Sequence, residues 1–249
     1  MERRIPRANR GILRDSLSEF TFIGIPVPKT TAVMARELAR LSSDCSFLLT
    51  HLVRQNEGRS DNEAHQTLKL ILDLAAKSAK PELRASQTSW YGTAASKIYN
   101  PATGAFDGDE NNRAVCFTES TLAGLKAHRD VFRAKYDLAF DRDYLFKQGA
   151  NPCLNRRESL LKEEIRCPRE KYANHVYNFI PSQLHPFVNI IHESFDATHE
   201  REWRIARDFP FNYRNLMFVF CPYDQFSRFS RIQSHGLPVL FDLEWLDRV

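Results

Sequence analysis

Two carboxylates stand close together in the segment FDATHEREWRIARDF, which covers residues 195–209. Glu200 and Glu202 flank Arg201, and Arg204 follows two residues later. Because side chains alternate with a period of two along a strand, a Glu-x-Glu pair at the start of a strand sends both carboxylates to one face. One carboxylate can hold a sugar hydroxyl and favour positive charge on the anomeric carbon, while the other orients or deprotonates an incoming nucleophile. The pattern is therefore typical of glycosyl transfer.

Two further segments place polar side chains where predicted apolar strands end. SFLLTHLVR carries His51 and Arg54 near its end, and AVCFTES ends in hydroxyls and a carboxylate. His51 or Arg54 can bind the phosphates or ribose of a dinucleotide, and the hydroxyls of Thr118 and Ser120 can brace a pocket through hydrogen bonds. Since ligand sites collect at such positions, we expect the three segments to converge on one cleft.

Strands and helices alternate along the chain, and these elements must position the candidate residues. Strands are expected at 46–54, 82–86, 114–120 and 136–141, in NPCLNR, and in EREWRIARD, NLMFVFCP and LPVLFDLEWL of the last third. Helices are expected at 30–43, at 61–79, after Ser120, around RDYLFKQG and twice within 157–180. This order predicts a single α+β domain over 45–249, preceded over 1–44 by a basic arm and a short helix.

The segment 87–112 is polar and contains glycine, and it is long for a connection within a compact domain. It carries Trp90, Tyr91 and Tyr99, aromatic residues that a solvated linker does not need. We therefore predict a mobile lid or a target-recognition element.

Composition limits the class of protein. The 249 residues include 35 basic and 31 acidic side chains, so the net charge of +4 does not resemble the concentrated basic face of a dedicated DNA-binding module. The five cysteines form no CxxC pair and suit reduced thiols, which indicates a cytoplasmic protein. No apolar run approaches the roughly 20 residues of a membrane span, and we expect no membrane partner.

Several familiar chemistries lack their motifs. The chain has no glycine-rich phosphate loop and no G-x-S-x-G elbow, and HEREW has Trp203 where HExxH needs its second histidine. A metal nuclease is disfavoured because Arg204 stands where a lysine is expected. His192, Glu193 and His199 can be imagined as metal ligands, but an irregular stretch separates the histidines, and we predict no metal site.

The order THLVR, LRAS, CFTES, YDLAFDRDYLFKQGANP and EREWRI resembles the AbiGi-type abortive-infection proteins of bacteria, from about Ser46 to Val219. More distantly, the three motif strands are similar to ADP-ribosyltransferases. Those enzymes use a His or Arg on the first strand, a Ser-Thr-Ser-like strand, and a Glu-x-Glu or Gln-x-Glu pair whose second Glu is catalytic. The resemblance implies an α+β fold with mixed or antiparallel ADP-ribosyltransferase-like sheets around a cleft and flanking helices.

The resemblance also implies site residues and a substrate. NAD is the expected substrate, Glu202 the catalytic carboxylate, and Glu200 its partner. The expected NAD-binding residues are His51, Arg54, Phe117, Thr118 and Ser120. Glu119 occupies the middle of the TES triplet, where the transferase pattern has Thr.

Two functional classes follow. The first is a phage-defence effector that cleaves NAD and transfers ADP-ribose to a protein or nucleic-acid target, or to water. The second is a catalytically silent antitoxin or sensor that binds a toxin or phage component, a class favoured by the Glu in TES and by the antitoxin description of an AbiGi member. In the plainest reading, Glu202 and Arg204 are only ion-pair partners on a solvated sheet face.

Overall fold

The computed structural model describes residues 46–53, 60–74, 80–87, 97–100, 105–108, 113–165, 174–176, 180–191, 193, 196 and 198–248. The chain divides into two units, 1–35 and 36–249. The expected N-terminal arm and its helix at 30–43 lie outside the described residues. No helix in the described part of the chain combines the length and the apolar character needed to cross a bilayer.

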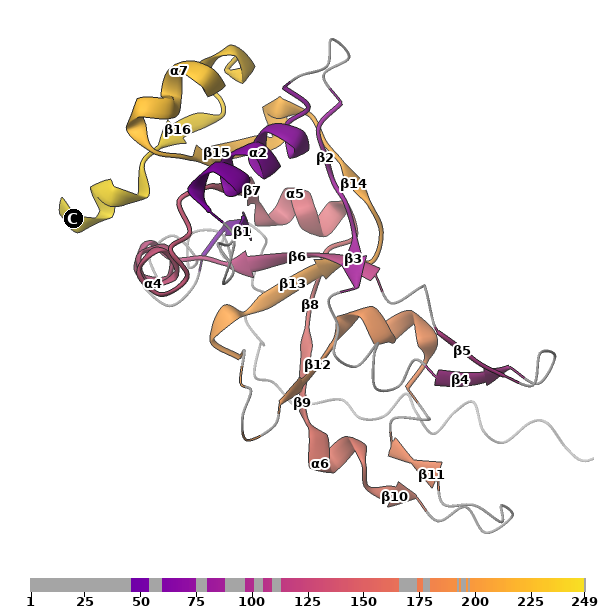
Figure 1. Ribbon diagram of the computed structural model, residues 1–249. Helices are drawn as coiled ribbons and strands as arrows, with labels where there is room; N and C mark the ends of the chain where they lie inside the picture. Colours follow the sequence, from indigo (N-terminus) through magenta and orange to yellow (C-terminus); the bar gives the residue numbers. More distant parts are fainter. Residues whose placement is uncertain are drawn as a thin grey trace, which may run out of the picture. The chain divides into compact units, whose positions relative to one another are not determined.

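An eight-stranded, mostly antiparallel sheet is the main element of the second unit (Figure 1). Its strands are, in spatial order, β16 (Val239–Phe241), β15 (Leu216–Phe220), β7 (Asp137–Asp141), β1 (Leu48–Leu52), β6 (Arg113–Glu119), β13 (Glu202–Ile205) and β8 (Asn151–Pro152), with β3 (Ser86–Gln87) also paired to β6. Among the described strand pairs of this sheet, only β15 and β16 run parallel. The fold is thus mixed α and β, as expected from the sequence.

Four short strand pairs lie outside this sheet. They are β2 (Glu82–Leu83) with β14 (Phe209–Pro210), β4 (Lys97–Asn100) with β5 (Ala105–Gly108), β9 (Leu154–Arg157) with β12 (Val188–Ile191), and β10 (Glu164–Ile165) with β11 (Asn174–His175). The β4–β5 hairpin corrects the prediction that 87–112 is a loop throughout. Within 157–180, where two helices were expected, α6 (Glu158–Leu161) is a single turn and β11 replaces the second helix.

Apolar side chains cover both faces of the sheet, because successive side chains of each strand point to opposite faces. Leu49, Leu138 and Phe140 point into the larger core, which includes Leu68 of helix α2 (Asp61–Ile71) and Leu145 of helix α5 (Arg142–Lys147). Leu48, Ala139 and Phe220 point the other way. They meet Leu125 of helix α4 (Leu122–Phe132) and two leucines of the final 3-10 segment η7 (Leu243–Arg248). The sheet therefore separates two cores.

Sequence signals at the helix ends match the observed boundaries in part. Ser60 caps α2 and forms a reciprocal capping box with Glu63. The helix ends earlier than expected, at Ile71, and Asp73 then has a left-handed φ of 50°. Such a conformation in a residue other than glycine is typical of a chain leaving a helix.

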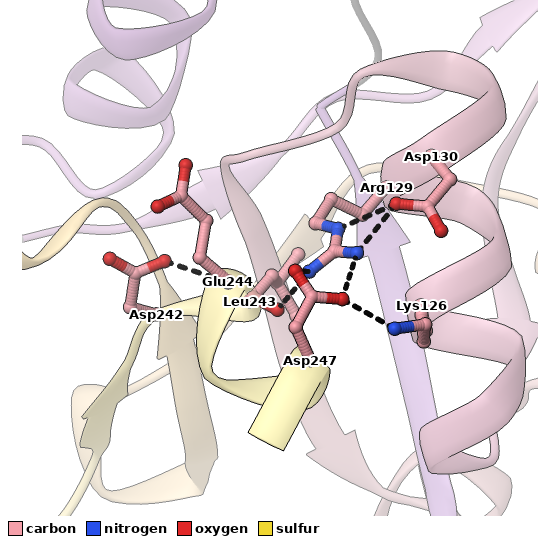
Figure 2. Close-up of polar contacts among 7 residues, drawn as sticks. All are labelled: Lys126, Arg129, Asp130, Asp242, Leu243, Glu244 and Asp247. Atoms are coloured by element: carbon pink, nitrogen blue, oxygen red, sulfur yellow. Dashed lines mark hydrogen bonds and ion pairs between the residues drawn. The ribbon is translucent and has the colours of Figure 1, made fainter. Parts of the chain in front are cut away.

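Arginine contacts fix the end of the chain against α4 (Figure 2). Arg129 donates to the carbonyl oxygen of Leu243 at 2.9 Å and to Asp247 Oδ1 at 2.7 Å, and Lys126 also pairs with Asp247. Asp242 caps the start of η7 by accepting from the backbone N–H of Glu244 at 2.9 Å. These polar contacts surround the smaller core and hold η7 in place.

Helix α2 allows a matched test of the larger core. Leu68 is fully buried, whereas Leu70, two residues later, is 77% exposed. We expect Leu68→Ala to lower the free energy of unfolding by about 2–5 kcal/mol and Leu70→Ala to change it by less than about 0.5 kcal/mol. Urea titration of both variants checks this, and equal effects would show that α2 does not pack on the sheet as described.

Candidate functional site

The three segments singled out in the sequence lie on neighbouring strands of the main sheet. Strand β6, which carries CFTE, lies between β1 and β13. Thr118 is the register partner of Thr50 on one side and of Glu202 on the other. Positions 50, 118 and 202 therefore form a row across three strands. Because directly paired residues point to the same face, their side chains share one face of the sheet.

His51 and Phe117 point to the opposite face, which corrects their assignment to one site with Glu202. His51 follows Thr50, and its ring lies 6.1 Å from that of Phe117. Phe117 is a member of the larger core, and His51 Nδ1 donates to the carbonyl oxygen of Cys116 at 2.9 Å. A shift of one residue along a strand reverses the face, so both side chains are directed away from Glu202. Arg54 lies outside the described residues.

Hydroxyl groups cluster beside the row. Thr50, Thr118 and Ser120 are all buried. The Thr50 and Ser120 hydroxyls hydrogen-bond to each other, and each also lies 3.2 Å from the carbonyl oxygen of Thr118. The cluster ties β1 to the end of β6 and fixes the backbone that faces Glu202.

Glu202 is largely buried, and both oxygens of its carboxylate accept hydrogen bonds. Its side chain is 10% exposed and that of Arg204 is 3% exposed. Arg204 donates from Nε to Oε1 at 2.8 Å and from Nη2 to Oε2 at 2.9 Å. Asn189 on β12 donates a third hydrogen bond, from Nδ2 to Oε2 at 2.8 Å. The pair is therefore a buried bidentate ion pair and does not lie on a solvated face.

The guanidinium of Arg204 also reaches beyond the sheet. It donates from Nη1 to the carbonyl oxygen of Pro186 at 2.8 Å, and Nη2 bonds to Asn189 Oδ1. Pro186 lies in the 3-10 segment η2 (Ser182–Phe187), which leads directly into β12. Arg204 thus joins β13 to a segment that lies outside the main sheet.

These contacts keep both partners ionised. Burial raises the pKa of Glu202, but the hydrogen bonds and charge of Arg204, with further hydrogen bonds from Cys116 and Asn189, outweigh burial and leave that pKa lowered. Burial likewise lowers the pKa of Arg204, and the hydrogen bonds and charge of Glu202 outweigh it, so that pKa is raised. An ionised carboxylate is the form that stabilises a developing positive charge.

Glu200 does not share the strand with Glu202, contrary to the Glu-x-Glu prediction. It ends the 3-10 segment η3 (Thr198–Glu200), and β13 begins only at Glu202. Between them Arg201 has a left-handed φ of 44°. The period of two that places both carboxylates on one face holds only within extended backbone, so the prediction that Glu200 lies on the same strand as Glu202 is wrong.

Glu119 connects the motif strands on the other side of the sheet. Its carboxylate accepts from the backbone N–H of Ser46 at 3.1 Å and from Trp203 Nε1 at 3.3 Å. Arg142 and Arg201 lie 3.8 and 3.7 Å from the same carboxylate. The residue that departs from the transferase triplet therefore has a structural role.

Two cysteine thiols border the ion pair. Cys116 is the register partner of Arg204, and the N–H of Cys153 donates to the carbonyl oxygen of Glu202 at 2.8 Å. Burial raises the pKa of the Cys153 thiol, so it stays protonated. No group of three or more His, Cys, Asp or Glu side chains suited to a metal ion occurs in the described ranges, and His192 lies outside them.

Sequence reasoning missed Thr50 and Asn189. Thr50 was detectable, because it lies one residue before His51 and therefore belongs to the other face of the same strand. Asn189 carries no motif, and only the three-dimensional arrangement brings it to Glu202. Comparisons with family models, curated proteins and solved structures found no match to this chain.

The ion pair predicts a large effect of Glu202→Gln on stability. The change leaves the buried Arg204 guanidinium without its counterion, so we expect a loss of about 3–5 kcal/mol in the free energy of unfolding. Glu244→Gln, which changes an exposed carboxylate of η7, is the matched control and should be nearly neutral. Chemical denaturation measures both, and an unchanged stability of Glu202→Gln would contradict the buried pair.

The lowered pKa of Glu202 also predicts a pH dependence. Folding lowers this pKa below its ordinary value of 4.5, so the ion pair stabilises the fold above that pH and loses its contribution as the pH falls through the folded-state pKa. We expect the stability difference between wild type and Glu202→Gln to be largest near neutral pH and to shrink in acid. Unfolding titrations across this range test it, and a pH-independent difference would refute it.

Proposed function

We propose that this chain is a phage-defence protein that cleaves NAD at the bond between nicotinamide and ribose, with Glu202 as the catalytic carboxylate. The observation that carries the proposal is the row of Thr50, Thr118 and Glu202 on one face of three adjacent strands. The resemblance of the same segments to AbiGi-type proteins and to ADP-ribosyltransferases supports the biological setting. The products are nicotinamide and either ADP-ribose bound to a protein or nucleic-acid acceptor or, when water attacks, free ADP-ribose.

The chemistry follows from the charge of Glu202. As nicotinamide leaves with the electrons of the broken bond, positive charge grows on the ribose carbon, and the transition state resembles an oxocarbenium ion. A carboxylate that accepts from the ribose 2′-hydroxyl stabilises this charge. A water or acceptor group then attacks the same carbon and loses its proton. The buried hydroxyls of Thr50 and Ser120 hold the strand geometry beneath the reacting ribose.

A second candidate is a silent antitoxin or sensor on the same scaffold. The specific observation that favours it is that Arg204 and Asn189 already occupy the carboxylate of Glu202. In addition, His51 points to the other face. In this case the ion pair only stabilises the sheet, and the chain acts by binding a toxin or a phage component.

Nicotinamide release from labelled NAD separates the two candidates. We expect the purified chain, incubated with lysate as a source of acceptors and partners, to release nicotinamide, and Glu202→Gln to reduce the rate about a hundredfold or more. Leu68→Ala is the matched control, because it also weakens the fold but lies in the larger core, to which Glu202 does not belong. Both variants are assayed at a temperature at which circular dichroism shows them folded.

The outcomes are distinct. Activity retained by Leu68→Ala and lost by Glu202→Gln supports catalysis by the carboxylate. Release at the wild-type rate by folded Glu202→Gln contradicts the enzyme and leaves the silent partner.

A further inference from the structure

Residues 154–165, 174–176 and 180–191 form a small substructure, called here the cap. It contains the parallel pair β9–β12, the pair β10–β11, helix α6 and η2. Leu161, Val188 and Ile190 form its own buried cluster, against which Val176 and Ile180 pack. No described residue of either main core belongs to this cluster. The apolar side of β12 therefore faces the cap itself.

The polar side of the cap meets the ion pair. Asn189, which lies between Val188 and Ile190 on β12, exchanges hydrogen bonds with Glu202 and Arg204. The carbonyl oxygen of Pro186 accepts a further bond from Arg204, and that of Val188 lies 3.4 Å from the same nitrogen. Contacts of this kind can exchange for water or ligand hydrogen bonds when they open, whereas an apolar interface loses its whole hydrophobic contribution.

The cap limits access to Glu202. The Glu202 side chain is only 10% exposed, and Asn189 takes one acceptor position of Oε2, so the closed cap limits the approach of a ribose hydroxyl. The Arg204 pair comes from the same strand and does not depend on the cap. Loss of the Asn189 contact thus frees one acceptor position on Oε2, which Arg204 still contacts, and the carboxylate stays ionised.

We propose that the cap is an autoinhibitory element that opens as a unit and that Asn189 is the latch holding it over Glu202. The consequence for NAD cleavage rests on the proposed function, but the opening itself does not. In this arrangement the protein is kept inactive until a partner or a phage component displaces β12 from β13.

Asn189→Ala tests the latch with two measurements that need no activity. Amide exchange should accelerate about tenfold or more in 154–165 and 180–191, the scale expected when hydrogen bonds to charged groups are lost, and stay unchanged in β7. Carbodiimide labelling of the Glu202 carboxyl, read by mass spectrometry, should rise in parallel. Gln183→Ala is the matched control, because Gln183 is an exposed residue of η2.

Nicotinamide release is measured on the same samples. Faster exchange confined to the cap, with more labelling of Glu202 and more nicotinamide, supports both the latch and the enzyme. The same exchange and labelling without nicotinamide release keeps the latch and overturns the proposed function. Unchanged exchange and labelling overturn the latch, as does equal loosening of cap and sheet, and release by the wild type as fast as by Asn189→Ala would overturn the autoinhibition.

Discussion

The buried ion pair between Glu202 and Arg204 is the constraint around which the site is built. Removing two charges from water is costly, and the cost is met only when geometry and additional hydrogen bonds are favourable. Here the pair is bidentate, and Asn189 and the carbonyl oxygen of Pro186 satisfy the remaining groups. The pair itself lies within strand β13, between β6 and β8, and the cap adds further hydrogen bonds to both partners.

The two faces of the sheet carry different polar contacts. On one face Glu119 ties together the start of β1, the indole of Trp203 and helix α5. On the other face the Thr50 and Ser120 hydroxyls brace the strands next to the ion pair. Glu119, which interrupts the transferase triplet, is thus a structural anchor that leaves the row of Thr118 and Glu202 unchanged.

Much of the main sheet could be predicted from the sequence, because apolar residues mark β1, β6, β7 and β15 and each of these strands packs on both faces. The cap could not be predicted, because its strands are short and because strand β11 lies where the second helix within 157–180 was expected. Likewise, the prediction that Glu200 and His51 share a sheet face with Glu202 was wrong for local reasons. The left-handed Arg201 breaks the alternation before Glu202, and His51 lies one residue out of phase with Thr50.

A crystal structure of the Asn189→Ala variant grown with a non-hydrolysable NAD analogue tests the central claim most directly. The account predicts that the ribose 2′-hydroxyl of the analogue lies within hydrogen-bonding distance of the Glu202 carboxylate, with β12 displaced from β13 and the Arg204 pair retained. An analogue bound elsewhere, or no bound analogue with the cap still closed over Glu202, would contradict it.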